Sequence, residues 1–463
     1  MCSSDLIADR LLGTHRSMLV GGWVIAAGHI TLALSQFFHY TAGPAISMDN
    51  GPGSLLAFLA GLAMIIIGTG FFKPCVSVMV GQLYEPGDAR RDSGFTIFYM
   101  GINLGAFLSP LVAGTLGETV GWHWGFGAAA VGMIAGLLTY QYLRPKYLKG
   151  IGDAPAGKMA SKDRTLVTIA LLALLGIPLV PMGLLMIGWL DPVREWLTQA
   201  MSSLGVYGVT GLLSAVLVAS VGTFLAFQPR GTRSKLAVIF ILAILGNLGF
   251  WTAFEQAGSS MTFFAANNTD RTLWGALDEP FPATWYQSVN ALSILIFAPI
   301  FGWLWVWLDR RRKNPSTPMK FAIGLWLLGL SFLAMVAGAY EAKNGKAGFH
   351  WLLITYVVYT WGELCLSPVG LSMVTKLASK QLQSLMMGLW FFSLALSNLC
   401  AGLVASYSTK FVDNPETGVA ATKSFLIPGL PGFYLMLVVG PIVIGIIIAL
   451  LTPVLKRMMQ DVK

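Results

Sequence analysis

One lysine lies inside a long apolar stretch of this sequence. Residues 64–80 contain a single charged side chain, Lys73, and an ammonium near the middle of a bilayer costs roughly 2.5–3.5 kcal/mol on insertion scales. Pro74 follows the lysine and removes a backbone hydrogen bond, while Gly68 and Gly70 precede it, so that a helix here bends easily. A charge kept in such surroundings beside a flexible helix indicates a functional site.

Other ionisable residues within apolar segments are few, and each is a site candidate: His29, Glu255 and Glu363. Glu363 and Ser367 are spaced i and i+4, which places them on one helix face, and Pro368 adds a bend. A carboxylate on such a face can hold the ammonium group of a ligand. A structural ion pair between Glu363 and Lys73 is the alternative interpretation.

Two further groups of side chains have helical spacing. Tyr99 and Asn103 are i and i+4, and a phenol with an amide on one face can hydrogen-bond the donors and acceptors of a peptide backbone. Trp251, Phe254 and Glu255 share a face, which predicts an apolar pocket wall with a charge at its edge. Simple packing is the alternative for the two aromatic residues.

The composition indicates which elements position these residues. The chain has 463 residues, 55% of them hydrophobic and 11% charged, and its mean hydropathy is +0.69, which excludes a soluble domain. Segments of about 20 apolar residues without strand alternation predict an all-α, polytopic membrane protein. Twelve spans are expected, at 17–38, 54–80, 94–116, 122–143, 165–190, 206–228, 236–258, 284–308, 321–340, 350–375, 384–407 and 432–454.

The distribution of basic residues explains the net charge of +9. Most of the lysines and arginines fall in alternate loops, as the positive-inside rule requires, so we expect the lipid bilayer rather than nucleic acid as the partner. Both termini are predicted to be cytoplasmic, in a multi-pass protein of the cell (inner) membrane. The four cysteines lack metal-ligand spacing, and neither a metal nor a disulfide is expected.

Two short polar turns suggest that the chain has two related halves. Asp9-Arg10 and Asp309-Arg310 stand at similar cytoplasmic helix ends, and secondary transporters are commonly built from such repeats, with the substrate site near the midplane where the repeats meet. The predicted domains are an N-terminal helical bundle at 1–143, a linker at 144–235 and a C-terminal bundle at 236–463. The linker holds two extra helices, 165–190 and 206–228.

Four strings together carry a resemblance to a known family: Gly68-Thr69-Gly70-Phe71-Phe72-Lys73-Pro74, Phe98-Tyr99 through Asn103-Leu104-Gly105, Phe250-Trp251 through Phe254-Glu255-Gln256, and Glu363 through Ser367. The chain resembles the proton-dependent oligopeptide transporter (POT/PTR) family of the major facilitator superfamily. The resemblance implies two six-helix bundles with two inserted helices. It also implies proton-coupled symport of di- and tripeptides by alternating access, driven by the proton gradient without a cofactor, in a monomer.

The resemblance also implies roles for single residues. Lys73 matches a lysine used in proton coupling and in the pocket for the substrate carboxylate, and Glu255 matches a charge used in gating or protonation. The remaining positions match substrate contacts: Tyr99 and Asn103 for the peptide, Asn290 and Glu363 with nearby Ser367 for its amino terminus, and Trp390 for a side-chain pocket.

The chain departs from the family pattern in two places. Cys75 stands where the family commonly has asparagine, and no Glu-x-x-Glu-Arg motif precedes the Asp9-Arg10 turn. We therefore expect a chain truncated at its N-terminus, lacking span one and most of span two.

Other classes of protein fit the sequence less well. An enzyme is disfavoured because no strand precedes Gly68-x-Gly70 and no nucleophile elbow is present. A non-transporting scaffold, or a transporter of nitrate or another small substrate, stays open. Retention of Glu363 favours a substrate that carries an amine.

Overall fold

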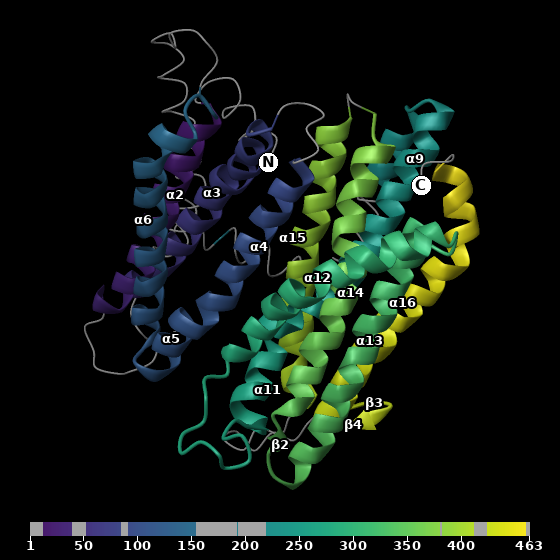
Figure 1. The fold of residues 1–463 in the computed structure, drawn as a ribbon. Helices are drawn as coiled ribbons and strands as arrows, with labels where there is room; N and C mark the ends of the chain where they lie inside the picture. Colours follow the sequence, from purple (N-terminus) through teal and green to yellow (C-terminus); the bar gives the residue numbers. More distant parts are fainter. Residues whose placement is uncertain are drawn as a thin grey trace. The chain divides into compact units, whose positions relative to one another are not determined.

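The computed structural model is predominantly helical and describes residues 13–38, 52–84, 91–153, 192, 219–379, 382–411 and 424–459 (Figure 1). Within these residues, ten helical stretches are long and apolar enough to cross a membrane. They coincide with ten of the twelve expected spans. The expected helix 165–190, most of 206–228 and the Asp9-Arg10 turn lie outside the described residues, so the inserted pair stays a prediction.

The structure divides into two compact units, Met1–Ile102 with Val112–Ser220 and Asn103–Leu111 with Val221–Lys463. The helices described for the first unit are α2 (Thr14–Leu34), η2 (Ser35–Phe38), α3 (Pro52–Gln82), α4 (Arg91–Ser109, shared with the second unit), η3 (Pro110–Gly114), α5 (Thr115–Thr119) and α6 (Trp122–Tyr147). The expected span 94–116 is thus interrupted by the π-helical segment η3.

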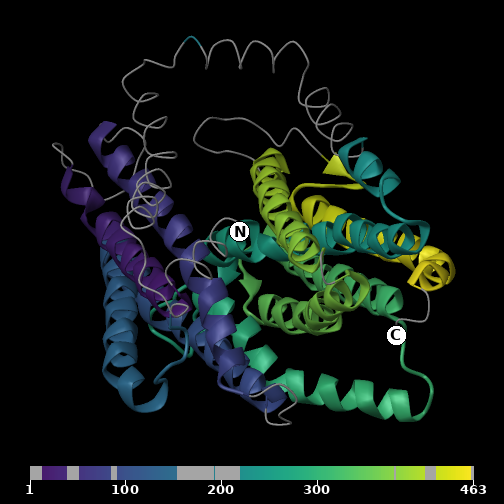
Figure 2. The same cartoon turned by 90° about the horizontal axis from the view of Figure 1, so that it is seen from above.

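Glycines allow α2 and α3 to pack backbone against backbone. A Cβ added to Gly21 would lie 2.6 Å from the carbonyl oxygen of Gly68, and one added to Gly28 would lie 2.8 Å from that of Gly61. Such close approach through small residues is how helices associate tightly within lipid. Helix α6 also packs along α2, as Figure 2 shows for the purple and blue helices. The helix that carries Lys73 is therefore fixed by its neighbour.

The second unit contains the remaining helices and four very short strands. The helices are α9 (Arg230–Ile241), η4 (Leu242–Leu248), α10 (Gly249–Phe254), η5 (Glu255–Gly258), α11 (Ser260–Asn268), α12 (Trp285–Arg310), α13 (Thr317–Glu341), η6 (Ala342–Asn344), α14 (His350–Leu377), α15 (Gln383–Ser408), η7 (Thr409–Phe411) and α16 (Leu430–Met459). Strands β1 (Thr269–Asp270) and β2 (Ala347–Gly348) pair in parallel, and β3 (Ser424–Phe425) and β4 (Ile427–Pro428) pair antiparallel.

The span that begins at Arg230 is segmented rather than a single regular helix. The α-helix changes to the π-helical η4, returns to α-helix at α10, tightens to the 3₁₀ turn η5 and breaks at Ser259, whose φ and ψ are −136° and −98°. The expected span 236–258 contains the π and 3₁₀ segments and ends one residue before the break. The two irregular segments were not predicted, because neighbouring groups can satisfy irregular backbone within membrane helices.

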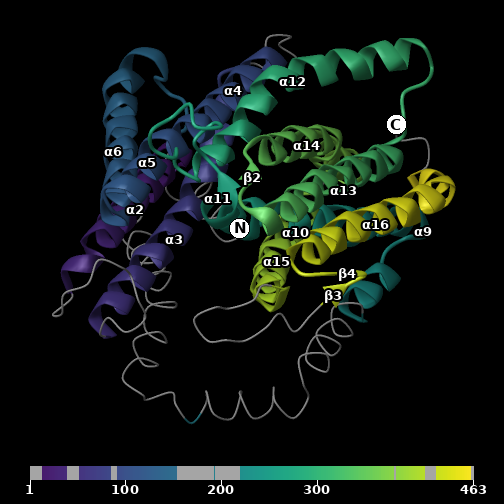
Figure 3. The same ribbon diagram turned by 90° about the horizontal axis from the view of Figure 1, so that it is seen from below.

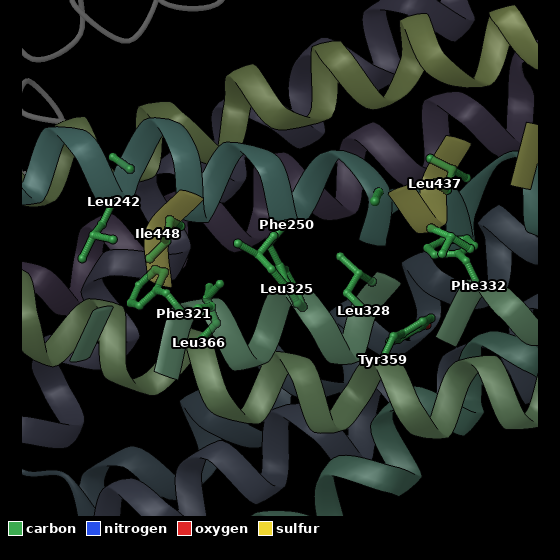
Figure 4. Close-up of a cluster of buried hydrophobic side chains, with 14 of the residues drawn as sticks. Leu242, Phe250, Phe321, Leu325, Leu328, Phe332, Tyr359, Leu366, Leu437 and Ile448 are labelled. Carbon is green, nitrogen blue, oxygen red and sulfur yellow. The ribbon is translucent and has the colours of Figure 1, made fainter. Parts of the chain in front are cut away.

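The core of the second unit lies among α10, α13, α14 and α16. Phe250, Phe321, Leu325 and Phe332 are fully buried there, and Figure 4 shows them with Tyr359 between the helices. Helix α13 packs against both α14 and α16, and α14 also packs against α12 (Figure 3). This core holds α14 in place, and α14 carries Glu363.

Candidate functional site

A buried carboxylate on α14 is bonded to an amide on α12. The Asn290 Nδ2 group donates to the Glu363 carboxylate oxygen Oε2 at 2.9 Å and to the Thr360 hydroxyl oxygen at 3.0 Å. The residue Glu363 is only 8% exposed. Burial of a charge requires hydrogen-bonded partners, and the amide supplies one. The expected association of Asn290 with Glu363 is thus present in the geometry.

Close packing of α14 against α13 fixes the position of Glu363 along the helix axis. A Cβ on Gly362, the preceding residue, would lie 2.6 Å from the carbonyl oxygen of Gly324 on α13, and a Cβ on Gly324 would lie 2.8 Å from that of Gly362. The two backbones therefore touch at the level of the carboxylate. A larger residue at either glycine would push α14 away and move the Glu363 side chain.

Thr360 sets the orientation of the Asn290 amide. Its hydroxyl donates to the Tyr356 carbonyl oxygen at 2.6 Å, one turn earlier on α14, which leaves the hydroxyl lone pairs to accept from Asn290. Both hydrogens of the amide nitrogen are then engaged, and its oxygen accepts no hydrogen bond from the described residues. The sequence analysis missed Thr360, although its i−3 spacing from Glu363 is a signal that would have found it.

Aromatic rings pack beside this pair. The ring of Phe254 lies 4.8 Å from that of Trp251 and 4.5 Å from that of Tyr359, both in edge-to-face arrangements. Tyr359 is on α14, next to Thr360, so the aromatic group and the Asn290–Glu363 pair share one helix. Glu255 follows Phe254 at the start of the 3₁₀ turn, half-buried. The two aromatic residues therefore pack together as their spacing predicts, and a pocket wall at this place stays a prediction.

The break after Glu255 is closed by side chains from neighbouring helices. The Tyr356 hydroxyl donates to the carbonyl oxygen of Ala257 at 3.4 Å, and the Tyr434 hydroxyl donates to that of Ser260 at 3.2 Å. Within α11, the Thr262 hydroxyl donates to the same Ala257 oxygen at 2.7 Å. Carbonyls freed at an interrupted membrane helix need such partners.

Two other expected residues of the second unit have different surroundings. Trp390 is 3% exposed, and its ring packs edge-on at 6.0 Å from that of Phe321, within the hydrophobic core. Ser367 lies one turn after Glu363 and is half-buried. A role for Trp390 in a side-chain pocket and for Ser367 in binding stays a prediction.

The expected residues nearer the N-terminus differ in their exposure. Lys73 is exposed on α3, and Tyr99 on α4 is 42% exposed, whereas Asn103, one turn further along α4, is 6% exposed. The ring nitrogen Nδ1 of His29 is buried on α2 without a partner among the described residues. Cys75 is buried and packs with Met18 and Met79 as a small apolar side chain.

No group of three or more histidine, cysteine, aspartate or glutamate side chains is arranged to hold a metal ion in the described parts of the chain. A helical membrane bundle with a buried, paired carboxylate and amide near an aromatic cluster is typical of the polytopic membrane transporters.

Comparison with known proteins identifies the family. The model of the POT family matches residues 15–422, and the chain belongs to this family. The peptide transporter YePEPT of Yersinia enterocolitica subsp. palearctica is 38% identical over 87% of this chain and 75% of its own length. A di-/tripeptide transporter of Lactococcus lactis subsp. lactis is 33% identical over 99% of this chain and 84% of its own length.

Solved structures agree with this assignment. A crystal structure of a POT peptide transporter in complex with sulfate is similar, with a TM-score of 0.73 and 33% identity, over 99% of this chain and 84% of the solved chain. The family and the helical membrane fold expected from the sequence are confirmed. The expected N-terminal truncation finds no support in the family match and stays a prediction.

Proposed function

We propose that this protein is a proton-coupled symporter that carries di- and tripeptides across the cell membrane by alternating access. The observation that carries the proposal is the buried Glu363 carboxylate held by the Asn290 amide. Membership of a family whose relatives are named as peptide transporters supports it. The energy comes from the proton gradient, and no cofactor takes part.

Glu363 and Asn290 receive the amino terminus of the peptide. A peptide ammonium needs hydrogen-bond acceptors, and the second carboxylate oxygen and the Asn290 amide oxygen are the two acceptors that this pair offers. A charge-assisted bond to the carboxylate is about twice as strong as a neutral one. Nitrate or another small anion would be repelled by the same carboxylate, so a substrate with an amine is favoured.

The other expected residues take complementary roles in this proposal. Tyr99 and Asn103 contact the peptide backbone, Trp251, Phe254 and Trp390 line space for its side chains, and Ser367 lies close to the amino terminus. Lys73 couples proton movement to the peptide carboxylate. Glu255 acts in gating or protonation at the segmented span, where a half-buried carboxylate sits beside the helix break.

The proposed architecture is that of two helical bundles with an inserted helix pair at 144–235, in a monomer of the cell (inner) membrane with both termini in the cytoplasm. The basic residues of alternate loops support this orientation.

Proteoliposomes provide the test of transport. The purified chain is reconstituted, and uptake of a radiolabelled dipeptide is measured with and without an imposed proton gradient, and in counterflow against an internal dipeptide. We expect counterflow without a gradient and accumulation above the external concentration with one. Dipeptide binding without counterflow would instead indicate a scaffold, and counterflow of nitrate alone would overturn the peptide assignment.

A further inference from the structure

A cationic turn ends helix α12. Four consecutive basic residues, Arg310–Lys313, are exposed there, and we refer to them as the α12 cationic turn. The single carboxylate beside them, Asp309, accepts a hydrogen bond from the Asn314 amide at 3.3 Å and is directed toward its own loop. The turn therefore presents a strong net positive charge that the peptide site does not use.

The backbone of this turn is ordered as a helix cap. The Lys313 N–H donates to the Leu308 carbonyl oxygen and the Arg312 N–H donates to that of Asp309, both at 2.9 Å. This is the Schellman pattern, in which the residue in the left-handed conformation is usually glycine. Here it is Arg312, with φ of +56°, at a cost of about 1–2 kcal/mol. A cation thus stands where the fold alone favours glycine.

Tryptophan rings hold neighbouring cations near the helix. The guanidinium carbon of Arg311 lies 4.1 Å from the Trp307 ring centroid, and the Lys320 ammonium of α13 lies 4.4 Å from that of Trp305. The Trp303 and Trp307 rings stack at 6.0 Å. Tryptophan with arginine or lysine is typical of the level where a membrane span meets the headgroups.

An exposed apolar face leads along α12 to the turn. Its side chains recur at helical spacing, they remain uncovered by the rest of the described structure, and Trp303 is 63% exposed: Leu292, Ile296, Ile300, Trp303 and Val306. The helix rises about 15 Å between Ile300 and Arg310, which is about half the thickness of the hydrocarbon core. An apolar stripe of this length capped by positive charge matches an acyl chain below a phosphate.

We propose that the α12 cationic turn and this apolar face bind an anionic diacyl phospholipid. The headgroup phosphate lies among the three arginines of the α12 cationic turn, Arg312 included, and Lys320, and an acyl chain lies along Ile300 and Trp303. Clusters of lysine and arginine at the end of a membrane span attract anionic lipid with about 1 kcal/mol per cation near the surface. The site rests on the membrane placement of α12 and is independent of the transported substrate.

Native mass spectrometry of the full detergent-solubilised chain tests the proposal, with phosphatidylglycerol as the probe. For the double variant Arg311→Gln with Arg312→Gln, we expect roughly 5- to 30-fold weaker binding of the first lipid, the upper value being two such cations converted to affinity. The matched control is Lys456→Gln with Arg457→Gln at the end of α16, where two exposed cations lack a tryptophan partner in the described structure. This control should bind the lipid as the unmodified chain does.

A second variant separates binding from folding. Arg312→Gly keeps the left-handed cap and should melt at the same or a higher temperature, yet bind phosphatidylglycerol several-fold more weakly. Phosphatidylcholine and glycerol phosphate should compete poorly. Equal losses in the α12 and α16 double variants, unchanged binding in Arg311→Gln with Arg312→Gln, or full competition by glycerol phosphate would each overturn the proposal.

Discussion

The two compact units hold their charged membrane residues in different ways. In the second unit, Glu363 is almost completely buried and is bonded to Asn290, with Thr360 behind it. In the first unit, Lys73 is exposed on α3, and its ammonium forms no ion pair within the described part of the chain. The Glu363 carboxylate is therefore held by hydrogen bonds within its own unit, whereas the Lys73 side chain is free to change its position.

Physical chemistry accounts for this difference. A carboxylate has a short side chain, so that once buried it needs donors from the same packed helices. A lysine has a long flexible stem, which can carry its ammonium toward water or a headgroup while the stem stays in apolar surroundings. In the proposed symporter, Glu363 is thus a preformed receptor for the substrate, and Lys73 is a charge whose side chain can move during transport.

The largest effect is expected for Lys73, the exposed charged residue of the first unit. Lys73→Ala should abolish proton-driven dipeptide accumulation in proteoliposomes while the fold is retained. Lys146→Ala, which removes an exposed lysine at the end of α6, is the matched control and should accumulate dipeptide normally. Uptake by Lys73→Ala that still follows the proton gradient would remove Lys73 from the coupling step.

The next effect is expected for Glu363→Gln, which removes the buried charge of the second unit. Loss of a charge-assisted bond worth roughly 1.5–3 kcal/mol should weaken peptides with a free amino terminus by about 10- to 150-fold in competition assays. N-acetylated peptides, which lack the ammonium, should lose little. If both kinds of peptide lose the same affinity, Glu363 supports the structure rather than the substrate.

A smaller effect is expected at the residue that orients Asn290. Thr360→Val keeps the shape but removes the hydroxyl that accepts from the amide, and free-amino peptides should bind roughly 2- to 10-fold more weakly. The control is Thr355→Val, also fully buried on α14, whose hydroxyl donates only to carbonyl oxygens. Competition by free-amino and N-acetylated peptides is compared for both variants, and equal losses of affinity would assign Thr360 to helix packing alone.

The smallest effect is expected for a carboxylate outside the spans. Asp270 accepts from the Thr272 hydroxyl at 2.6 Å and from the Thr272 N–H at 2.9 Å, and these bonds lower its pKa below the ordinary value of 3.8. The folded state therefore gains stability above that ordinary value and loses it as the pH falls through the lowered pKa. Asp270→Asn retains an acceptor oxygen, so its melting temperature should fall slightly less than that of the parent between pH 5 and pH 2, taken as roughly the range of this titration. A larger fall would contradict this assignment.

The spans were predictable from the sequence because a membrane leaves a helix few alternatives. Segments such as 122–143 and 350–375 correspond to α6 and α14, since every backbone group must be paired inside lipid. Residues on one helix were also predictable: Trp251 and Phe254 do pack together. Spacing along one helix is local information, and the sequence contains it directly.

Contacts between helices were harder to predict. The Asn290–Glu363 pair joins α12 to α14, and it was expected only from the family resemblance, because spacing along one helix does not determine which helices become neighbours. The packing of Trp390 beside Phe321 was not predicted either, and its role in a side-chain pocket stays a prediction. The spacing of Thr360 from Glu363 marks it as a neighbour on the same helix face, but its role depends on Asn290 of another helix, which that spacing does not indicate.

The π-helical segment η4, Leu242–Leu248, determines how the orientation of the span beyond it depends on the number of residues that precede it. A π turn holds an additional residue within an otherwise α-helical segment. Because the π segment absorbs that residue locally, removing one residue there would restore the ordinary winding and leave Trp251 and Phe254 facing nearly the same neighbours. Removing one residue from the regular α-helix α9 would instead turn everything beyond it by about 100° around the axis. Single-residue deletions in η4 should therefore be tolerated better than single-residue deletions in α9.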